Sequence, residues 1–480
     1  MVQEALMERY IVFGTGSGGQ RVVNMLRQYP DIEITYCLDN YPKSSVFMDI
    51  PVIKAGDFLK REDKAGYYYC IASVYKDEIT HQLLGNGIQD GNILTETDIF
   101  LNHIDEAGRQ VVYKTLNNDV WQAVFDLSCG FCLGGVEKWS YNLAAGLARR
   151  GKKIKLLSNN SDGMPPGHLE DYAVKSGVEN FWDFKIKSIQ TLTDELMKCM
   201  PCTVFVAHMS DLMAACILLK RKYPEKIKVF SVVHGGLEYL VHDNRAVLDY
   251  IDYVLCVSSD MYKALVNKED ARRNKILFKE TPVNITDIST KEYTLDSRQP
   301  VKIAYAARLE KLHKHSELLI PLIEKLEEKK AAYVLDIAGD GGLFGMVNSF
   351  VDGNNLSGKV NLLGQLEYKE MESFWLKHDI SVNLSECEGC SMSMLESMSA
   401  GAVPVYTDVF STRHFIEDGK NGFVVSYNDI EKMAGCILEL ERDRERMTCM
   451  GKAAHNVIAG KCGLDGYIDF LLGYIDGKVI

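Results

Sequence analysis

The chain has 480 residues, of which 46% are hydrophobic, and its net charge is −12. This length predicts about three domains of roughly 100–200 residues each, and the acidic balance argues against nucleic acid as the main partner. The first residues include an acid and no long apolar run, and no stretch approaches the roughly 20 apolar residues of a membrane span. We therefore expect a cytoplasmic protein.

Residues 1–110 are predicted to form a small Rossmann-like accessory domain. A strand at Arg9–Phe13 is followed by a glycine-rich turn, a helix at Gln20–Tyr29 and a second strand at Ile34–Leu38. Shorter apolar segments follow, too few for the two mononucleotide halves of a full dinucleotide-binding fold. No His or Lys constellation for hydride transfer accompanies them.

The glycines of this turn have the spacing G-x-G-x-x-G at Gly14, Gly16 and Gly19, and Asp39 ends the second strand. In a dinucleotide fingerprint such glycines let the backbone approach a phosphate, and the acid holds ribose hydroxyls. Close packing of the backbone explains the same turn. The sequence therefore leaves accessory nucleotide binding and a packing role as alternatives.

Residues 119–297 are predicted to form a second α/β unit, preceded by a connector at 103–118. A strand at Val120–Phe125 leads through Gly134 and Gly135 into an amphipathic helix, and these glycines could contact a phosphate or sugar hydroxyl at the helix start. Short apolar runs, each ended by a polar loop, predict a buried parallel sheet. They are Lys153–Leu157, Thr203–Ala207, Lys228–Val233, Tyr253–Val257 and Lys275–Phe278.

Two histidines, His208 and His234, directly follow predicted strands of this unit. They are therefore expected at the carboxyl edge of the sheet, where α/β proteins bind ligands. His234 is the better candidate because Gly235 and Gly236 leave the backbone room beside it. Each could equally be an ordinary loop histidine with a satisfied ring.

A third α/β unit is predicted at 298–463. Its first strand, Val301–Tyr305, is followed by a loop with Arg308 and Lys314. Arginine offers a bidentate fork and lysine a point charge, and both suit a diphosphate, although a solvated basic loop would look the same. A final helical pattern at 464–480 could cross back to the second unit.

The stretch Ser385–Val405 contains two glutamates, Glu388 and Glu396. It reads as a strand end, a loop with Glu388, and a helix that carries Glu396 about two turns in and stops at Gly401. The glutamates are then roughly 10 Å apart, too far for the pair of a retaining glycosidase, which needs about 5–5.5 Å. The free amides at the helix start could seat a phosphate between them, unless this is a plain strand–helix unit.

Thirteen cysteines favour a reducing compartment over a disulfide framework. Three pairs have C-x-x-C spacing: Cys129/Cys132, Cys199/Cys202 and Cys387/Cys390. Two such pairs could bind zinc if their loops met. However, the third pair flanks Glu388, where a metal would compete with the carboxylate. We predict structural or incidental thiols and no metal site.

Several short motifs follow one another along residues 120–480. They are Gly134-Gly135-Val-Glu137, His234-Gly235, Pro282-Val-Asn284, Arg308 with Lys314, Gly339-Asp-Gly, Glu388-x7-Glu396 and Asp418-Gly-Lys-Asn-Gly422. In this order the chain resembles retaining GT-B glycosyltransferases of family 4. The resemblance implies two Rossmann-like lobes that face a cleft: an acceptor lobe at 119–297, completed by the helix at 464–480, and a donor lobe at 298–463. Residues 1–110 resemble the small domains attached to glycan-biosynthesis enzymes.

The resemblance also implies a nucleotide-sugar donor (UDP-, GDP- or ADP-sugar), no required cofactor, and roles for the candidate residues. Arg308 and Lys314 would neutralise the diphosphate, Glu396 would bind the ribose, and Glu388 the donor sugar. His234 would approach the sugar or the acceptor hydroxyl. The phosphate seat would be formed by Gly134, Gly135, Gly389, Cys390, Ser391 and Met392. Cys390 and Ser391 depart from the residues usual in the family, which puts the donor preference in doubt.

The acceptor is expected to be a glycan or a lipid-linked glycan of a surface polysaccharide or cell envelope. Basic residues gather at Arg149-Arg150, Lys152-Lys153-Lys155 and Lys220-Arg221-Lys222, a pattern that suits either peripheral contact with the inner face of the cell membrane or solvated helix ends. A nucleotide-sugar epimerase of the same fold, or a non-catalytic partner of another glycosyltransferase, remains an alternative function.

Overall fold

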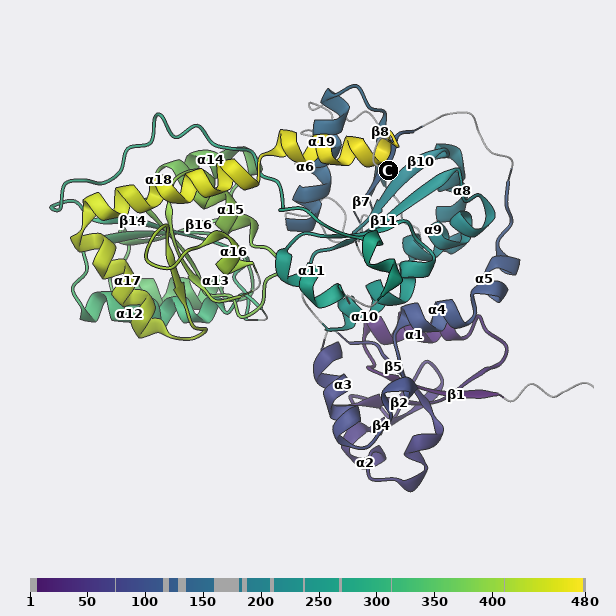
Figure 1. Ribbon diagram of the computed structural model, residues 1–480. Coiled ribbons are helices and arrows are strands. Elements are labelled where there is room, and N and C mark those ends of the chain that lie inside the picture. Colours follow the sequence, from purple (N-terminus) through teal and green to yellow (C-terminus); the bar gives the residue numbers. More distant parts are fainter. Residues whose placement is uncertain are drawn as a thin grey trace, which may run out of the picture.

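The computed structural model describes residues 7–73, 75–114, 121–127, 135–158, 188–207, 211–235, 238–266, 270–311, 313–409 and 411–477, and the backbone alone of 181–183. Three sheets, each covered by helices, follow one another along the chain (Figure 1). We call the three units the accessory domain, the first lobe and the second lobe. The α/β fold class predicted from the sequence is confirmed.

The accessory domain is a sheet of order β3-β4-β2-β1-β5-β6, parallel except between β3 and β4. Its strands are β1 (Glu8–Phe13), β2 (Ile32–Asp39), β3 (Val46–Phe47), β4 (Ile50–Lys54), β5 (Tyr68–Ile71) and β6 (Ile93–Leu94). Its α-helices are α1 (Ser17–Leu26), α2 (Ala55–Phe58), α3 (Lys76–Gly85), α4 (Glu96–Asn102) and α5 (Ile104–Gln110).

Helix α5 lies within the segment 103–118 that the sequence analysis described as a connector, and its helical structure was not predicted. Its apolar residues Ile104 and Ala107, with Phe100 of α4, belong to the hydrophobic core of the first lobe. Helix α4 begins at a capping box, in which Thr95 and Asp98 each satisfy the other's backbone amide. These two helices thus join the accessory domain to the next unit.

The first lobe is a parallel sheet of order β13-β12-β11-β10-β7-β8-β9. Its strands are β7 (Ala123–Leu127), β8 (Ile154–Ser158), β9 (Phe181–Asp183), β10 (Cys202–Val206), β11 (Ile227–Val233), β12 (Tyr253–Cys256) and β13 (Ile276–Phe278). Its α-helices are α6 (Gly135–Arg149), α8 (Ile189–Cys199), α9 (Asp211–Lys222), α10 (Glu238–Ala246) and α11 (Ser259–Leu265).

The second lobe is a parallel sheet of order β16-β15-β14-β17-β18-β19. Its strands are β14 (Val301–Ala306), β15 (Tyr333–Ala338), β16 (Val360–Gly364), β17 (Ile380–Asn383), β18 (Val403–Thr407) and β19 (Phe423–Val425). Its α-helices are α12 (Leu319–Glu328), α13 (Phe344–Gly353), α14 (Tyr368–Leu376), α15 (Met392–Ser399), α16 (Thr412–Phe415), α17 (Ile430–Arg442) and α18 (Arg444–Lys461).

Helix α19 (Leu464–Ile475) returns to the first lobe and lies beside α6 (Figure 1). Tyr467 meets the ring of Trp139 edge-on at 6.2 Å, and Tyr474 meets Tyr253 at 5.0 Å. Ile468 packs so closely on Gly146 that a Cβ there would lie 2.2 Å from its Cδ1 atom. The chain therefore crosses from the second lobe back to the first at its end.

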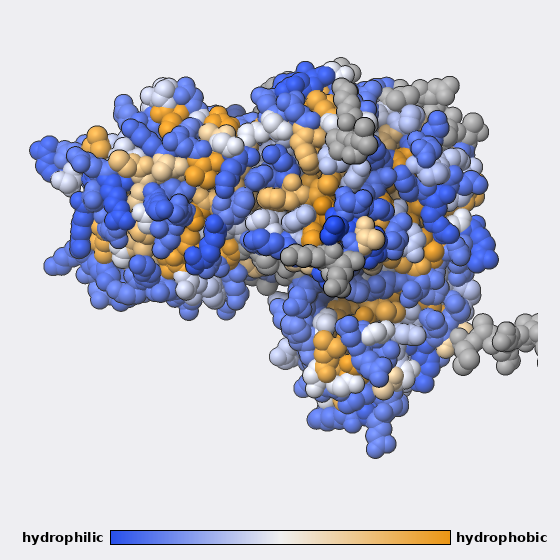
Figure 2. Space-filling model, in the orientation of Figure 1, coloured by the Kyte–Doolittle hydropathy of each residue, from blue (hydrophilic) through white to orange (hydrophobic). Residues whose placement is uncertain are grey.

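Strand order reverses at one place in each sheet. The chain builds outward on one side of β1, β7 or β14, and then on the other side from β5, β10 or β17. The loops that follow the two central strands diverge there and leave a crevice at the carboxyl edge, where open α/β sheets bind ligands. On the face shown in Figure 2, hydrophilic residues predominate over all three units.

Candidate active site

The reversal point of the second lobe brings together two residues that are far apart in the sequence. Lys314 follows β14 and Glu388 follows β17, and these strands are neighbours, with Ile303 paired to Ile380. The Nζ atom of Lys314 lies 2.5 Å from Oε1 of Glu388, and the Ser385 hydroxyl donates to the same oxygen at 2.9 Å. Their side chains are only 20% and 12% exposed, so both charges are largely shielded from bulk solvent.

Arg308, the other predicted cation, is not brought to Glu388. Its side chain is 69% exposed and pairs with Glu310 at 3.1 Å. The loop that carries it is held by Gly339 and Gly341 of the Gly-Asp-Gly motif, where a Cβ would lie 1.9 Å from the carbonyl oxygen of Ala307 and 2.5 Å from that of Leu309. Both glycines have positive φ values. The backbone conformation and the close packing therefore explain why glycine stands at both positions of the motif.

Helix α15 begins beside Glu388, as the sequence predicted. Ser391 is its N-cap and accepts a hydrogen bond from the amide of Met394, and Gly401 ends it with φ +72°. The helix starts at Met392, and Glu396 is its fifth residue, in the second turn, near the place predicted from the sequence.

The two lobes meet at the phosphate seat predicted from the sequence. A Cβ on Gly389 would lie 1.8 Å from the carbonyl oxygen of His234, and a Cβ on Gly135 would lie 3.2 Å from Cγ of Met392. Only glycine fits at position 389, because the obstacle is backbone. The backbones of the lobes therefore approach directly at the start of α15.

Glu396 forms an ion pair with Lys138 of α6, and each side chain is 17% exposed. The Lys138 ammonium also lies 4.3 Å from the centre of the Tyr368 ring, and the Tyr368 hydroxyl donates to Asn142 at 3.0 Å. Sequence reasoning missed Lys138. The signal was a lysine in the first turn of a helix, where the helix dipole disfavours a cation.

His234 follows β11 directly, as predicted, and its ring meets that of Trp139 edge-on at 5.1 Å. His234 belongs to the first lobe, and its carbonyl oxygen contacts Gly389 in the loop of Glu388. His208, Gly134 and Gly236, together with the cysteine pair Cys129/Cys132, lie outside the described residues.

The thiols near Glu388 are protonated at neutral pH. Burial raises the pKa of Cys390 to about 11, although hydrogen bonds to Ser411 and Thr281 act in the opposite direction. Burial and the charge of Glu388 raise the pKa of Cys387 as well. Within the described part of the chain, no group of three or more His, Cys, Asp and Glu could hold a metal ion.

The glycine turn of the accessory domain is tightly packed. A Cβ at Gly14, which has φ +125°, would lie 2.7 Å from the carbonyl oxygen of Ala72, and one at Gly19 would lie 2.2 Å from that of Gly14. Around Gly16 there is open space. The Asp39 carboxylate accepts from the Thr15 hydroxyl at 2.6 Å and from the Tyr41 amide at 2.9 Å. These contacts account for the motif through packing, and nucleotide binding here stays a prediction.

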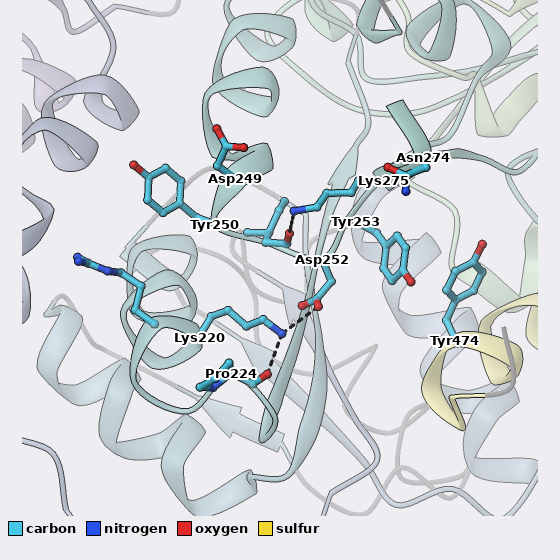
Figure 3. Close-up of a pocket in the computed structure, with 11 residues that line it drawn as sticks. Lys220, Pro224, Asp249, Tyr250, Asp252, Tyr253, Asn274, Lys275 and Tyr474 are labelled. Atoms are coloured by element: carbon cyan, nitrogen blue, oxygen red, sulfur yellow. Dashed lines mark hydrogen bonds and ion pairs between the residues drawn. The ribbon is translucent and has the colours of Figure 1, made fainter. Parts of the chain in front are cut away.

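A cavity of about 730 Å³ opens at the opposite, amino edge of the first lobe (Figure 3). The two lysines that line this cavity donate hydrogen bonds to oxygen atoms of the protein itself. Lys220 donates to Asp252 and to the Pro224 carbonyl at 2.9 Å, and Lys275 donates to the carbonyls of Leu248 and Ile251. It lies away from the carboxyl edge that carries His234 and is not part of the candidate site.

Two of the basic residues considered for a membrane surface form ion pairs within the protein. Arg150 pairs with Asp465 and Asp469 of α19, and Arg221 pairs with Asp105 of α5. The first pairs join the end of α6 to α19, and the last joins the first lobe to the accessory domain. None of the described helices combines the length and the apolarity needed to cross a bilayer.

Comparison with known proteins agrees with this architecture. Residues 133–285 match the family model for Glycosyltransferase Family 4, and residues 289–457 match the model for Glycosyl transferases group 1. A segment of 149 residues is 32% identical to a poly(ribitol-phosphate) alpha-N-acetylglucosaminyltransferase of Staphylococcus aureus, covering 30% of this chain and 29% of that protein. An uncharacterized glycosyltransferase of Methanocaldococcus jannaschii is 30% identical over 136 residues, 28% of this chain and 37% of that protein.

Solved structures share the fold at low identity. Anabaena HepE, solved in complex with UDP, is 14% identical with a TM-score of 0.58, covering 73% of this chain and 99% of that one. A glycosyltransferase of Rickettsia africae is 16% identical with a TM-score of 0.60, covering 75% and 98%. The predicted GT-B architecture is thus confirmed, and two consecutive segments of the chain match models of glycosyltransferase domains.

Proposed function

We propose that the protein is a retaining glycosyltransferase that moves a sugar from a nucleotide-sugar donor to a glycan or lipid-linked acceptor of a cell-envelope or surface polysaccharide. The observation that carries this proposal is the Lys314–Glu388 pair, held at the reversal point of the second lobe and facing the first. The names of the relatives and the UDP complexes of the neighbours support it and favour a UDP-sugar as the first donor to test.

The proposed donor spans the two glutamates. Glu396 accepts hydrogen bonds from the ribose hydroxyls, and the diphosphate lies between, against Lys314 and the first amides of α15. Glu388 accepts from hydroxyls of the transferred sugar. In the structure each glutamate forms an ion pair with a lysine. An ammonium has three donors, so the lysines can bind phosphate oxygens while they remain near the carboxylates.

The proposed chemistry is electrostatic. The acceptor hydroxyl attacks the anomeric carbon on the face from which the diphosphate leaves, the bond to the diphosphate oxygen breaks, and that oxygen takes the hydroxyl proton. Lys314 stabilises the growing negative charge, and Arg308 joins it by exchanging Glu310 for the diphosphate. His234 positions the reacting sugar or the acceptor from the first lobe. Positioning and charge stabilisation of this kind supply most of the catalysis in such sites.

Two measurements test this function. A thermal-shift screen of UDP-, GDP- and ADP-sugars should show stabilisation by one nucleotide series and no comparable effect of NAD. A product assay should then show fast release of nucleoside diphosphate only when an acceptor is present. Conversion of the donor sugar without any acceptor would instead establish an epimerase, and donor binding without turnover towards any acceptor would indicate a non-catalytic partner.

A further inference from the structure

The start of helix α10 in the first lobe is held by an acid from the accessory domain. The Asp77 carboxylate of α3 accepts hydrogen bonds from the amides of Glu238 at 3.0 Å and Tyr239 at 3.2 Å. First-turn amides of a helix have no partner within the helix and are usually capped by a nearby side chain. The residues just before Glu238 are Gly, Gly and Leu, which offer no such side chain. Asp77 therefore caps the start of α10 from the accessory domain.

Helix α10 also contacts the accessory domain through its side chains. The Nε2 atom of His242 lies 2.9 Å from both carboxylate oxygens of Asp98 in α4. The Lys76 ammonium lies 4.8 Å from the centre of the Tyr239 ring. The accessory domain thus holds α10 over its first two turns, so its docking is fixed by specific polar contacts.

Helix α10 in turn adjoins the candidate active site. Only three residues separate Glu238 from His234, whose carbonyl oxygen lies against Gly389 beside Glu388. A Cβ on Gly235 would lie 2.8 Å from Cδ1 of Leu240, so the backbone after His234 packs directly on α10. A displacement of the start of α10 would therefore move His234 and its contact with the second lobe.

We propose that Asp77 is a positioning residue for sugar transfer, and that the accessory domain serves as a brace that sets the place of His234 through α10. This inference rests on the proposed function, because it assigns His234 to the transfer reaction. It gives residues 7–114 a role in the transferase that does not require them to bind a nucleotide.

The test uses the full-length protein and the variant Asp77→Ala. Hydrogen exchange of the Glu238 and Tyr239 amides should become at least roughly ten-fold faster, because both lose their acceptor. The kcat of transfer should fall roughly ten-fold, while the Kd of the donor stays within about two-fold, since the donor seat belongs to the second lobe. Asp77→Asn retains one acceptor oxygen and should give intermediate values for both. If the alanine variant does not fold, the asparagine variant carries the test.

Asp57→Ala is the matched control, because Asp57 is an exposed acid of the same domain whose ion-pair partner is Lys60, in its own domain. It should leave both readouts unchanged. Unchanged amide exchange or unchanged kcat in folded Asp77→Ala would overturn the brace, as would a loss confined to donor binding. Failure of the proposed function would look different: if the wild-type protein transferred no sugar to any acceptor, the reaction itself would be refuted, while the amide-exchange result for Asp77→Ala would still stand.

Discussion

The backbone of Gly389 packs directly against the carbonyl oxygen of His234, so the loop of Glu388 and the end of strand β11 are in contact across the two lobes. Gly389→Ala would place a methyl group 1.8 Å from that oxygen. Because both groups in this clash belong to backbone, it can be relieved only if one lobe moves relative to the other. We expect kcat/KM for transfer to fall by about 10²-fold or more, with a lower Tm. Gly345→Ala is the control, because nothing lies within 4 Å of its Cβ position, and it should leave kcat/KM unchanged.

Much of this arrangement could be predicted from the sequence, because apolar runs of four to seven residues marked the strands of the parallel sheets. The ends of β14 and β17 therefore showed where Lys314 and Glu388 would emerge. Their direct pairing depends on strand order, which no local pattern encodes. Helix α5 was missed because it has only seven residues and is stabilised by packing of Ile104 and Ala107 on another unit, which the local sequence does not indicate.

Contacts between units were the main part of the site that sequence reasoning could not supply. Lys138 pairs with Glu396 and Asp77 caps α10, and in each case the partner is more than 150 residues away along the chain. Such partners follow from tertiary structure alone, so only weak signals existed, such as a lysine in the first turn of a helix.

Lys138→Ala should weaken donor binding. The substitution removes the cation that holds Glu396 in place and the contact with Tyr368 across the lobes. We expect the KM for the donor to rise roughly three- to ten-fold, the effect of losing a partly buried ion pair, with a smaller change in kcat. Lys198→Ala in the same lobe is the control, since its pair with Glu195 is confined to α8. A lower donor KM in the Lys138 variant would mean that the lysine competes with the ribose.

The contact between His242 and Asp98 should make stability depend on pH. The hydrogen bond that His242 donates to the Asp98 carboxylate raises the pKa of His242 above its ordinary value, so the protonated form is favoured in the folded state. This contribution is fully present below about pH 6.5 and is lost as the pH rises through the raised pKa. The difference in Tm between wild type and His242→Gln should therefore be largest at about pH 5.5 and shrink as the pH rises through the raised pKa of His242.

Asp243 acts in the same direction over a lower range. Burial raises its pKa to about 6, so the folded protein holds a proton that the unfolded chain releases from about pH 4 upward. Stability should fall as the pH rises between these values, and Asp243→Asn should remove that fall. Urea unfolding of both proteins between about pH 4 and 7 measures it. An equal slope in the variant would show that Asp243 is not the titrating group.

Cys387 and Cys390 are expected to be dispensable as thiols. Their raised pKa values keep them protonated at neutral pH, which makes them poor metal ligands and poor nucleophiles. The double variant Cys387→Ser with Cys390→Ser should retain kcat within about three-fold, because a serine hydroxyl can still hydrogen-bond to Thr281 and Ser411. Transfer by the wild type should also survive EDTA. Loss of transfer in both experiments would point to a metal held by these thiols.

The most direct test of the account is the transfer rate of Lys314→Ala, compared with Lys311→Ala, which alters an exposed lysine of the same loop. With the donor identified in the thermal-shift screen, Lys314→Ala should remain folded and lose about 10²–10³-fold in kcat, because the leaving diphosphate loses its nearest cation. Lys311→Ala should match the wild type. Wild-type turnover by folded Lys314→Ala would contradict the assignment of the Lys314–Glu388 pair as the centre of the active site.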